Sequence, residues 1–238
     1  MGNVTISQSK SKRTFVYLVV LSALALALAG CRRPDQVITL DQAMKNNCLE
    51  TIIPGSSDEL RVKQSLEGCK TIKYDTVIHS TGQIGSKSGT SYLWKISPTQ
   101  SSTINLIHGV VNLITLQIEK GMNLGALVQE FGNPESIYVS YQTHENCVAS
   151  IMLDYPDRGF SVGFDKAFDC SAIGNDGLAQ LSLDESINVT EYYLYQANNL
   201  NAVLSNAFLM TDQSIKQNQN YRQPWPGFSM IQAKPLTQ

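Results

Sequence analysis

Histidine, tryptophan and charged residues are scarce in this chain of 238 residues. It contains three histidines and two tryptophans, and only 16% of its residues are charged. Histidine is the commonest metal ligand and a frequent acid–base catalyst, but His79, His108 and His144 form no spaced pair. The Gly-x-Ser-x-Gly and His-Glu-x-x-His motifs are also absent. The sequence therefore offers no catalytic constellation, and we expect a protein without enzymatic activity, metal or cofactor.

An excess of positive charge and a long membrane-spanning run are missing as well. The formal net charge is −2, whereas a nucleic-acid-binding surface needs a basic patch, so we expect no nucleic-acid partner. The longest uncharged apolar run, Phe15–Ala29, has 15 residues. A transmembrane helix needs about 20 apolar residues, so this run is too short for one.

The segment around this run is typical of a secretory signal. Lys10, Lys12 and Arg13 precede it, and small residues follow it. It ends in Leu28-Ala29-Gly30-Cys31, which resembles a bacterial lipobox. The resemblance implies cleavage before Cys31 and lipidation of its sulfur and its new N-terminus, which anchors the chain in a membrane. The alternative is an uncleaved membrane anchor with an ordinary cysteine beside it.

Cleavage would leave a mature chain of 208 residues that starts at Cys31. The removed residues 1–30 carry three positive charges and no negative ones, so the net charge becomes −5. We expect this chain on a cell membrane or an outer membrane, facing away from the cytoplasm. Arg32 replaces the aspartate that marks inner-membrane retention in some bacteria, but the choice between the two membranes stays open.

Four further cysteines predict two disulfides, because an even number of cysteines in an exported chain is typical of paired thiols. Of the three possible pairings we favour Cys48–Cys69 and Cys147–Cys170. Each would close a loop of about 20 residues and contribute roughly 3 kcal/mol. A tight turn at 155–159 would also bring Cys147 opposite residues 168–170. A zinc site is the rival interpretation, but the close Cys-x-x-Cys spacing is absent.

The pattern of apolar residues and turn signals divides the mature chain into four parts. They are a lipidated tether (31–40), a first α/β unit (41–118), a second α/β unit (119–172) and a C-terminal strand and helix extension (173–238). Helices are expected at 40–49, 58–66, 124–131 and 200–209. Strands are expected at 73–79, 91–96, 103–107, 110–118, 136–141, 148–154, 160–164 and 189–195.

The two central units have a similar order of signals. Each begins with an apolar strand end, a glycine turn and a capped, apolar-faced helix, and each continues with strands. The predicted fold class is therefore α+β, with two similar units of a helix plus an antiparallel meander and with the helices on one face of the sheet or sheets. Coincidence is the alternative, because capped helices after glycine turns are common.

One motif in the second unit points to a family. Gly121-Met122-Asn123 opens the predicted helix, and Phe131-Gly132-Asn133-Pro134 ends it. This pattern resembles the small SmpA/OmlA-type lipoproteins of the outer-membrane barrel-assembly machinery, and the tandem arrangement resembles the beta-lactamase inhibitor protein. The resemblance covers about residues 118–165, and Asn123 and Phe131 replace the family's usual threonine and leucine. It implies structural roles for Gly121, Met122, Gly132 and Pro134, and thus supports fold more than function.

Several sequence features are candidates for a binding surface. The Gly-rich segment 80–90 is expected to be a hairpin loop that can touch a partner. A weak cation site around Asp154, Asp157 and Asp165 competes with ordinary turn acids. Aromatic residues on both faces of 189–195 fit either a recognition surface or a sheet that is covered on both faces. Trp225, in a Pro-rich segment, is expected to dock against the body of the protein.

Two functions remain after these exclusions. The first is a lipid-anchored, non-enzymatic interaction or structural module of the cell envelope, with a protein partner. The second is a lipoprotein that binds a ligand or peptidoglycan in a pocket between the two units. A flat apolar patch would favour the first, and a concave pocket would favour the second. The sequence does not indicate the oligomeric state.

Overall fold

A computed structural model describes residues 37–236 of the chain, except 98–99, 144, 202 and 204–218. The chain divides into residues 1–37 and 38–238, and the fold is that of the second unit. The signal segment 1–30, Cys31, His144 and most of the predicted helix 200–209 lie outside the described residues. In the described part of the chain, no helix is long and apolar enough to span a membrane.

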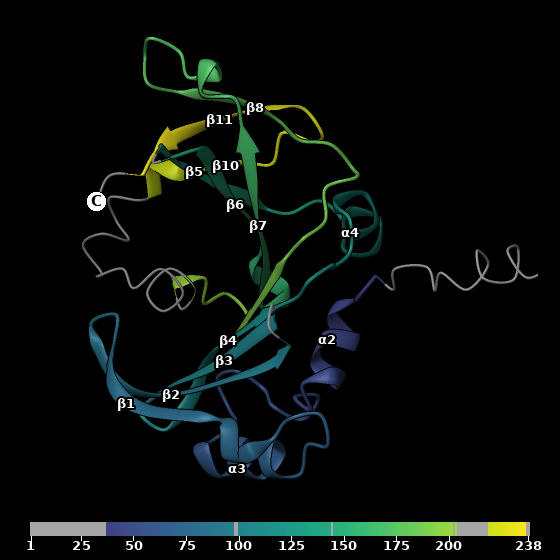
Figure 1. Cartoon of the computed structure of the whole chain (residues 1–238), viewed down its shortest axis with the longest axis vertical. Helices are drawn as coiled ribbons and strands as arrows, with labels where there is room; N and C mark the ends of the chain where they lie inside the picture. The colour runs from purple at the N-terminus through teal and green to yellow at the C-terminus, as the bar shows by residue number, and fades with distance from the viewer. Residues whose placement is uncertain (1–36, 98–99, 144, 202, 204–218, 237–238) are drawn as a thin grey trace, which may run out of the picture. The chain divides into compact units, whose positions relative to one another are not determined.

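The described part folds around one mixed sheet of 11 strands (Figure 1). The strand order is β1-β2-β3-β4-β9-β7-β6-β5-β11-β8, and β10 pairs with β5 beside this path. Neighbouring strands are antiparallel except β11 and β5. The bounds are β1 Ile78–Ile84, β2 Lys87–Ser97, β3 Gln100–Ile107, β4 Val110–Gln117, β5 Ser136–Thr143, β6 Cys147–Tyr155, β7 Phe160–Phe168, β8 Ala179–Ser182, β9 Glu191–Tyr195, β10 Arg222–Pro224 and β11 Met230–Pro235.

This sheet overturns the predicted fold class of two helix-plus-meander units. Strand β9 lies between β4 and β7 and pairs with both, so no sheet boundary separates the two halves. The predicted C-terminal extension also supplies β8, β10 and β11. The local signals described the helices and most strands, but the partners of β9 and of the C-terminal strands depend on contacts far away in the sequence.

Three α-helices occur in the described residues, and each begins where a capping side chain predicts it. Helix α2 (Leu40–Asn46) has a capping box between Thr39 and Gln42. In helix α3 (Glu59–Glu67) the side chain of Asp58 accepts a hydrogen bond from the amide of Arg61. In helix α4 (Leu124–Phe131) Asn123 does the same for Ala126. These contacts satisfy amides that have no partner within the helix.

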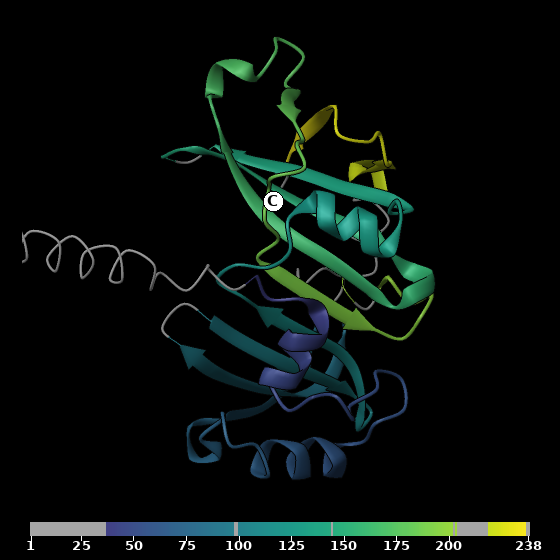
Figure 2. The same cartoon turned by 90° about the vertical axis from the view of Figure 1, so that its right-hand side faces the viewer.

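The helices cover one face of the sheet, and Figure 2 looks towards this side. The covered face, which we call the helix face, carries the main hydrophobic core. Asn47, at the end of α2, accepts hydrogen bonds from Trp94 and Ser102 on β2 and β3, at 3.1 and 2.7 Å. This pairing satisfies buried polar groups within the core. Tyr192 of β9 contributes to the same core and donates a hydrogen bond to the carbonyl of Ile38.

The opposite face, which we call the open face, carries a smaller apolar cluster. Because successive side chains of a strand point to opposite faces, Tyr193 and Tyr195 lie here while Tyr192 lies on the helix face. The aromatic residues of β9 therefore belong to a sheet with a hydrophobic cluster on each face. The other members of the open-face cluster are Leu113, Tyr138, Met152, Leu200, Val203 and Tyr221.

Two local predictions need correction. Segment 80–90, expected as a loop, forms most of β1, the start of β2 and a two-residue turn at Gly85-Ser86. Segment 73–79, expected as a strand, instead contains the short 3-10 helix η1 (Tyr74–Thr76) before β1 begins. The first error arises because the small polar residues of 80–90 weaken the alternation of apolar and polar side chains. Trp225 packs on the main core as expected, in edge contact with Phe228.

Candidate binding site on the sheet

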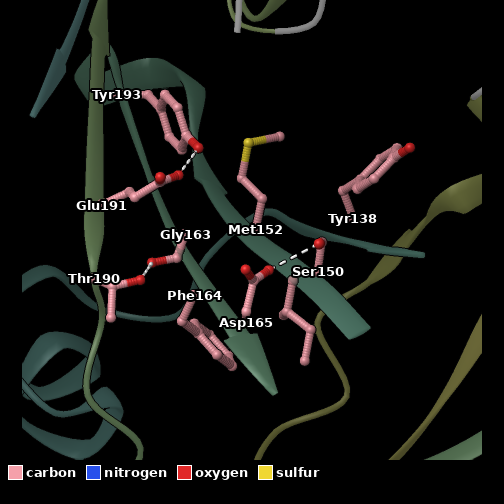
Figure 3. A pocket seen from close by; sticks show the side chains of 10 residues that line it. Tyr138, Ser150, Met152, Gly163, Phe164, Asp165, Thr190, Glu191 and Tyr193 are labelled. Atoms are coloured by element: carbon pink, nitrogen blue, oxygen red, sulfur yellow. Dashed lines mark hydrogen bonds between the residues drawn. The ribbon is translucent and has the colours of Figure 1, made fainter. Parts of the chain in front are cut away.

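A shallow cavity of about 260 Å³ lies on the open face, over strands β5, β6, β7 and β9 (Figure 3). Its position follows from the strand register, because Tyr138, Met152, Gly163 and Glu191 lie side by side on neighbouring strands. Gly163 has no side chain, and the row therefore has a gap between Met152 and Glu191. We call this cavity the Gly163 hollow. Its lining residues are Tyr138, Ser150, Ile151, Met152, Gly163, Phe164, Asp165, Thr190, Glu191 and Tyr193.

The geometry around Gly163 leaves little room for a larger residue. A Cβ atom added at this position would lie 3.0 Å from the Tyr193 ring and 3.5 Å from a carboxylate oxygen of Glu191. A glycine within a strand often marks such a close approach. Any larger side chain at residue 163 would either push Tyr193 aside or fill the hollow.

Two carboxylates, Asp165 and Glu191, give the hollow its charge, and none of the lining residues is basic. Ser150 donates a hydrogen bond to Asp165 Oδ1 at 2.8 Å. Gln117 donates to Glu191 Oε1 at 2.9 Å, and the Tyr193 hydroxyl donates to Oε2. A carboxylate has about four acceptor positions, so these neutral donors orient both groups and leave acceptor positions for a cation.

The two tyrosines at the hollow remain neutral phenols at physiological pH. Burial raises the pKa of Tyr138 to about 12. The pKa of Tyr193 is raised well above its ordinary value, first by burial and then by the negative charges of Glu191 and Asp165. A neutral aromatic ring beside a carboxylate is a suitable contact for an ammonium or guanidinium group.

A second polar group, which we call the Asp154 cluster, lies on the same face next to the hollow. Asp154 is completely buried, and it accepts hydrogen bonds from Ser136 at 2.8 Å and Ser161 at 3.0 Å. Arg222 approaches its carboxylate to 3.3 Å. Tyr195 contacts Ser161 at 3.0 Å. The acceptor positions of Asp154 are thus occupied within the protein, which indicates that the cluster holds β10 against the sheet.

Burial raises the pKa of Asp154 above its ordinary value of 3.8, although Arg222 and the two serines favour the charged form. Desolvation is the largest effect because this carboxylate has no contact with solvent. Asp154, Asp157 and Asp165, which the sequence offers as a weak cation site, do not come together as one. Asp154 is buried, while Asp157 and Asp165 are exposed, and the described residues contain no group of three or more metal-ligating side chains.

The cysteine pairing is the one favoured from the sequence. Cys48 is bonded to Cys69, and Cys147 is bonded to Cys170, with Cα–Cα distances of 5.6 and 5.5 Å. The register of β6 and β7 explains the second pair, because Cys147 lies opposite Phe168. The turn that produces this register contains Pro156–Arg158, followed by Gly159 with a positive φ of 73°.

The four motif residues have structural surroundings. A Cβ atom on Gly121 would lie 2.7 Å from Val189 O, so only glycine fits there without a shift. Met122 is buried in the main core. Gly132 ends α4 with a positive φ of 83°, and Pro134 is buried just beyond it.

The sequence interpretation missed the Gly163 hollow. The sequence indicates Asp165 only as a member of a weak cation site or as an ordinary turn acid, and it gives no signal for Glu191. One signal was present: an isolated glycine interrupts the predicted strand 160–164. Its meaning depends on Glu191, which is 28 positions away in the sequence and opposite Gly163 in the sheet. The two described histidines lie outside the hollow; His79 contacts Tyr92, and His108 is a turn residue with a positive φ of 55°.

Comparison with protein families, with curated proteins and with solved structures finds no match for this chain.

Proposed function

We propose that this protein is a lipid-anchored, non-enzymatic binding module of the cell envelope, and that the Gly163 hollow receives a lysine or arginine side chain of a protein partner. The observation that supports the contact is the pair of carboxylates beside neutral tyrosines in a glycine gap. The anchor rests on the lipobox-like Leu28-Ala29-Gly30-Cys31. The lipid restricts the module to a membrane surface, where it meets its partner.

The size of the hollow favours a side chain over a free ligand. Small-molecule pockets usually measure about 300–1,000 Å³, while this cavity has about 260 Å³. It also lies over neighbouring strands of one sheet and not between two units, where the ligand-binding alternative places its pocket. An arginine side chain fits this space, and its planar head can contact both a carboxylate and an aromatic ring.

The cation preference can be tested with two small probes, N-acetyl-arginine amide and N-acetyl-norleucine amide. A cation–π contact and charge-assisted hydrogen bonds together suggest an affinity of the order of 1 mM for the arginine probe. NMR titration of the protein should shift signals of β6, β7 and β9 with the arginine probe and much less with norleucine. Equal effects of the two probes would overturn the proposed specificity.

Matched variants test whether the arginine probe binds in the Gly163 hollow. The double variant Asp165→Asn, Glu191→Gln keeps the shapes of the side chains and removes both charges, so it should abolish the arginine response. The control Glu50→Gln, Glu145→Gln removes the same charge from exposed residues outside the hollow and should retain it. Gly163→Val should also abolish binding, because the added side chain would displace the Tyr193 ring or fill the cavity.

A photo-crosslinking residue at position 190 tests whether a protein partner contacts the hollow, because Thr190 is exposed there. In membranes this residue should crosslink to a partner, and the yield should fall in the carboxylate double variant but not in its control. A yield that is the same in all variants would contradict the hollow as the contact.

The anchor has an independent test. Mass analysis of the membrane form should find acyl mass on a chain that begins at Cys31. A Cys31→Ser protein should leave the membrane fraction, and its continued presence there would refute the lipobox interpretation.

A further inference from the structure

Strand β1 forms a free edge of the sheet (Figure 1). Its residues Ile78–Ile84 pair with β2 on one side, and the first six are exposed. No backbone hydrogen bond joins them to any other described segment. Such an edge presents a row of unpaired N–H and C=O groups, which can pair with another strand.

The usual protections against edge pairing are absent from β1. Its sequence, Ile-His-Ser-Thr-Gly-Gln-Ile, contains no lysine, carboxylate or proline, and its register with β2 has no bulge. The strand β8 at the other end of the sheet has only four residues, and a short edge is itself a protection. The nearby carboxylate of Glu59 is ion-paired with Lys63 at 3.0 Å and lies 3.8 Å from His79 of β1.

The turn determines which backbone groups of β1 point outwards. Ile84 pairs with Lys87 across the two-residue turn Gly85-Ser86, so this is a hydrogen-bonded pair. Bonded and non-bonded pairs alternate along an antiparallel ladder. Ile78, Ser80, Gly82 and Ile84 therefore direct their backbone groups towards β2. His79, Thr81 and Gln83 direct theirs towards the free edge.

We propose that β1 is a self-association edge, at which a second copy of this chain adds its own β1 in antiparallel register centred on Thr81. In this register Thr81 lies opposite Thr81 of the second copy, and His79 lies opposite Gln83. All of these residues have outward backbone groups, so about six interchain hydrogen bonds form. A two-fold axis through the Thr81 pair makes the interface self-complementary and closed.

The side chains of β1 match the same register. Ile78 is 61% exposed although it is a large apolar residue, and Ile84 is almost completely buried. The register places Ile78 opposite Ile84 of the second copy, and Ser80 opposite Gly82. Pairing thus covers an exposed isoleucine at each end of the strand and brings no like charges together.

The symmetry also agrees with attachment of both copies to one membrane. The two-fold axis is perpendicular to the sheet, so the helix faces of both copies lie on the same side. The described domain begins at Ile38, whose carbonyl accepts a hydrogen bond from Tyr192 of the helix face. Both domains of the pair therefore begin on the same side of the paired sheets. Self-association does not depend on the Gly163 hollow, which lies on strands β5, β6, β7 and β9.

Cysteine crosslinking of the full chain in membranes tests the register. The four cysteines after Cys31 are in disulfides, so Thr81→Cys adds a reactive thiol. Hydrogen-bonded pairs have Cα atoms about 5.5 Å apart, a separation suited to a disulfide. Thr81→Cys should form a covalent dimer under mild oxidation, and His79→Cys, four positions from its own copy in this register, should not.

Charge placed on the edge gives a second measurement. In detergent, the protein mass should be that of two chains and should fall to one chain in Thr81→Lys, because two lysines would meet at the axis. Thr90→Lys adds the same charge to the neighbouring strand and should remain dimeric. A monomeric parent protein, equal crosslinking at residues 79 and 81, or crosslinks of Thr81→Cys only to other proteins would each overturn the proposal.

Discussion

At the scale of single residues, the most constrained group is the carboxylate of Asp154. It has no exposure to solvent, and its three partners are Ser136 of β5, Ser161 of β7 and Arg222 of β10. Burying a charge is costly unless hydrogen bonds and an opposite charge compensate it. The cluster therefore depends on all of its members being present.

Arg222→Met should lower the free energy of unfolding more than the double variant Arg222→Met, Asp154→Asn. The single change leaves a buried charge without its counterion, which usually costs about 3–5 kcal/mol. We expect about 2–3 kcal/mol, because the Arg222 side chain is 29% exposed and its interaction is partly screened. Urea unfolding measures both variants. Equal losses in the two would show that the ion pair has no such role.

Asp154 should make the free energy of unfolding depend on pH. Its folded-state pKa lies above the ordinary value of 3.8, so the unfolded chain ionises first as pH rises. Between 3.8 and the raised pKa the folded state holds the extra proton, and the free energy of unfolding therefore decreases with rising pH. Asp154→Asn lacks this contribution. The stability of the parent protein relative to this variant should fall from below pH 3.8 towards neutral pH, and a rise would contradict the assignment.

At the scale of elements, the helix starts and the turn at 155–159 could be predicted because their signals are close together in the sequence. Asp58 and Asn123 cap helices that begin one residue later, because a cap and its amides are close in sequence. The turn at 155–159 likewise forms where its proline and glycine predict it. Strands β8 and β11 were not predicted, since each is short and is defined by a partner about 50 residues away.

Asn123→Ala should destabilise the protein by about 1 kcal/mol through loss of the cap on α4. The side chain of Asn123 accepts a hydrogen bond from the amide of Ala126 at 2.8 Å, and alanine leaves that amide without it. Asn123→Asp keeps an acceptor oxygen and should retain most of the stability. Thermal or urea unfolding distinguishes the two variants, and equal losses would mean that the cap is not the cause.

At the scale of the whole molecule, β9 decides the architecture. The sequence predicted a strand at 189–195 but gave no indication that it lies between β4 and β7. The two expected units thus share one sheet, and the Gly163 hollow exists only because β9 brings Glu191 and Tyr193 beside β7. The candidate site and the single sheet were not predicted for the same reason: both depend on a long-range strand pairing that local patterns do not specify.

A continuous sheet should unfold in one cooperative transition, whereas two independent units would unfold separately. The two tryptophans are well placed to test this, because Trp94 lies in β2 and Trp225 follows β10, which pairs with β5 in the other half of the strand order. Trp225→Phe leaves the fluorescence of Trp94 as the reporter of one half of the sheet, and Trp94→Phe leaves that of Trp225 as the reporter of the other half.

Each variant is also followed by circular dichroism, so that its fluorescence is compared with its own backbone transition. In both variants the two signals should share one urea midpoint, because the pairing of β9 with β4 and β7 couples the two halves. If the Trp225 signal changed at a lower urea concentration than the backbone signal of the same variant, the C-terminal strands would form a separately stable part.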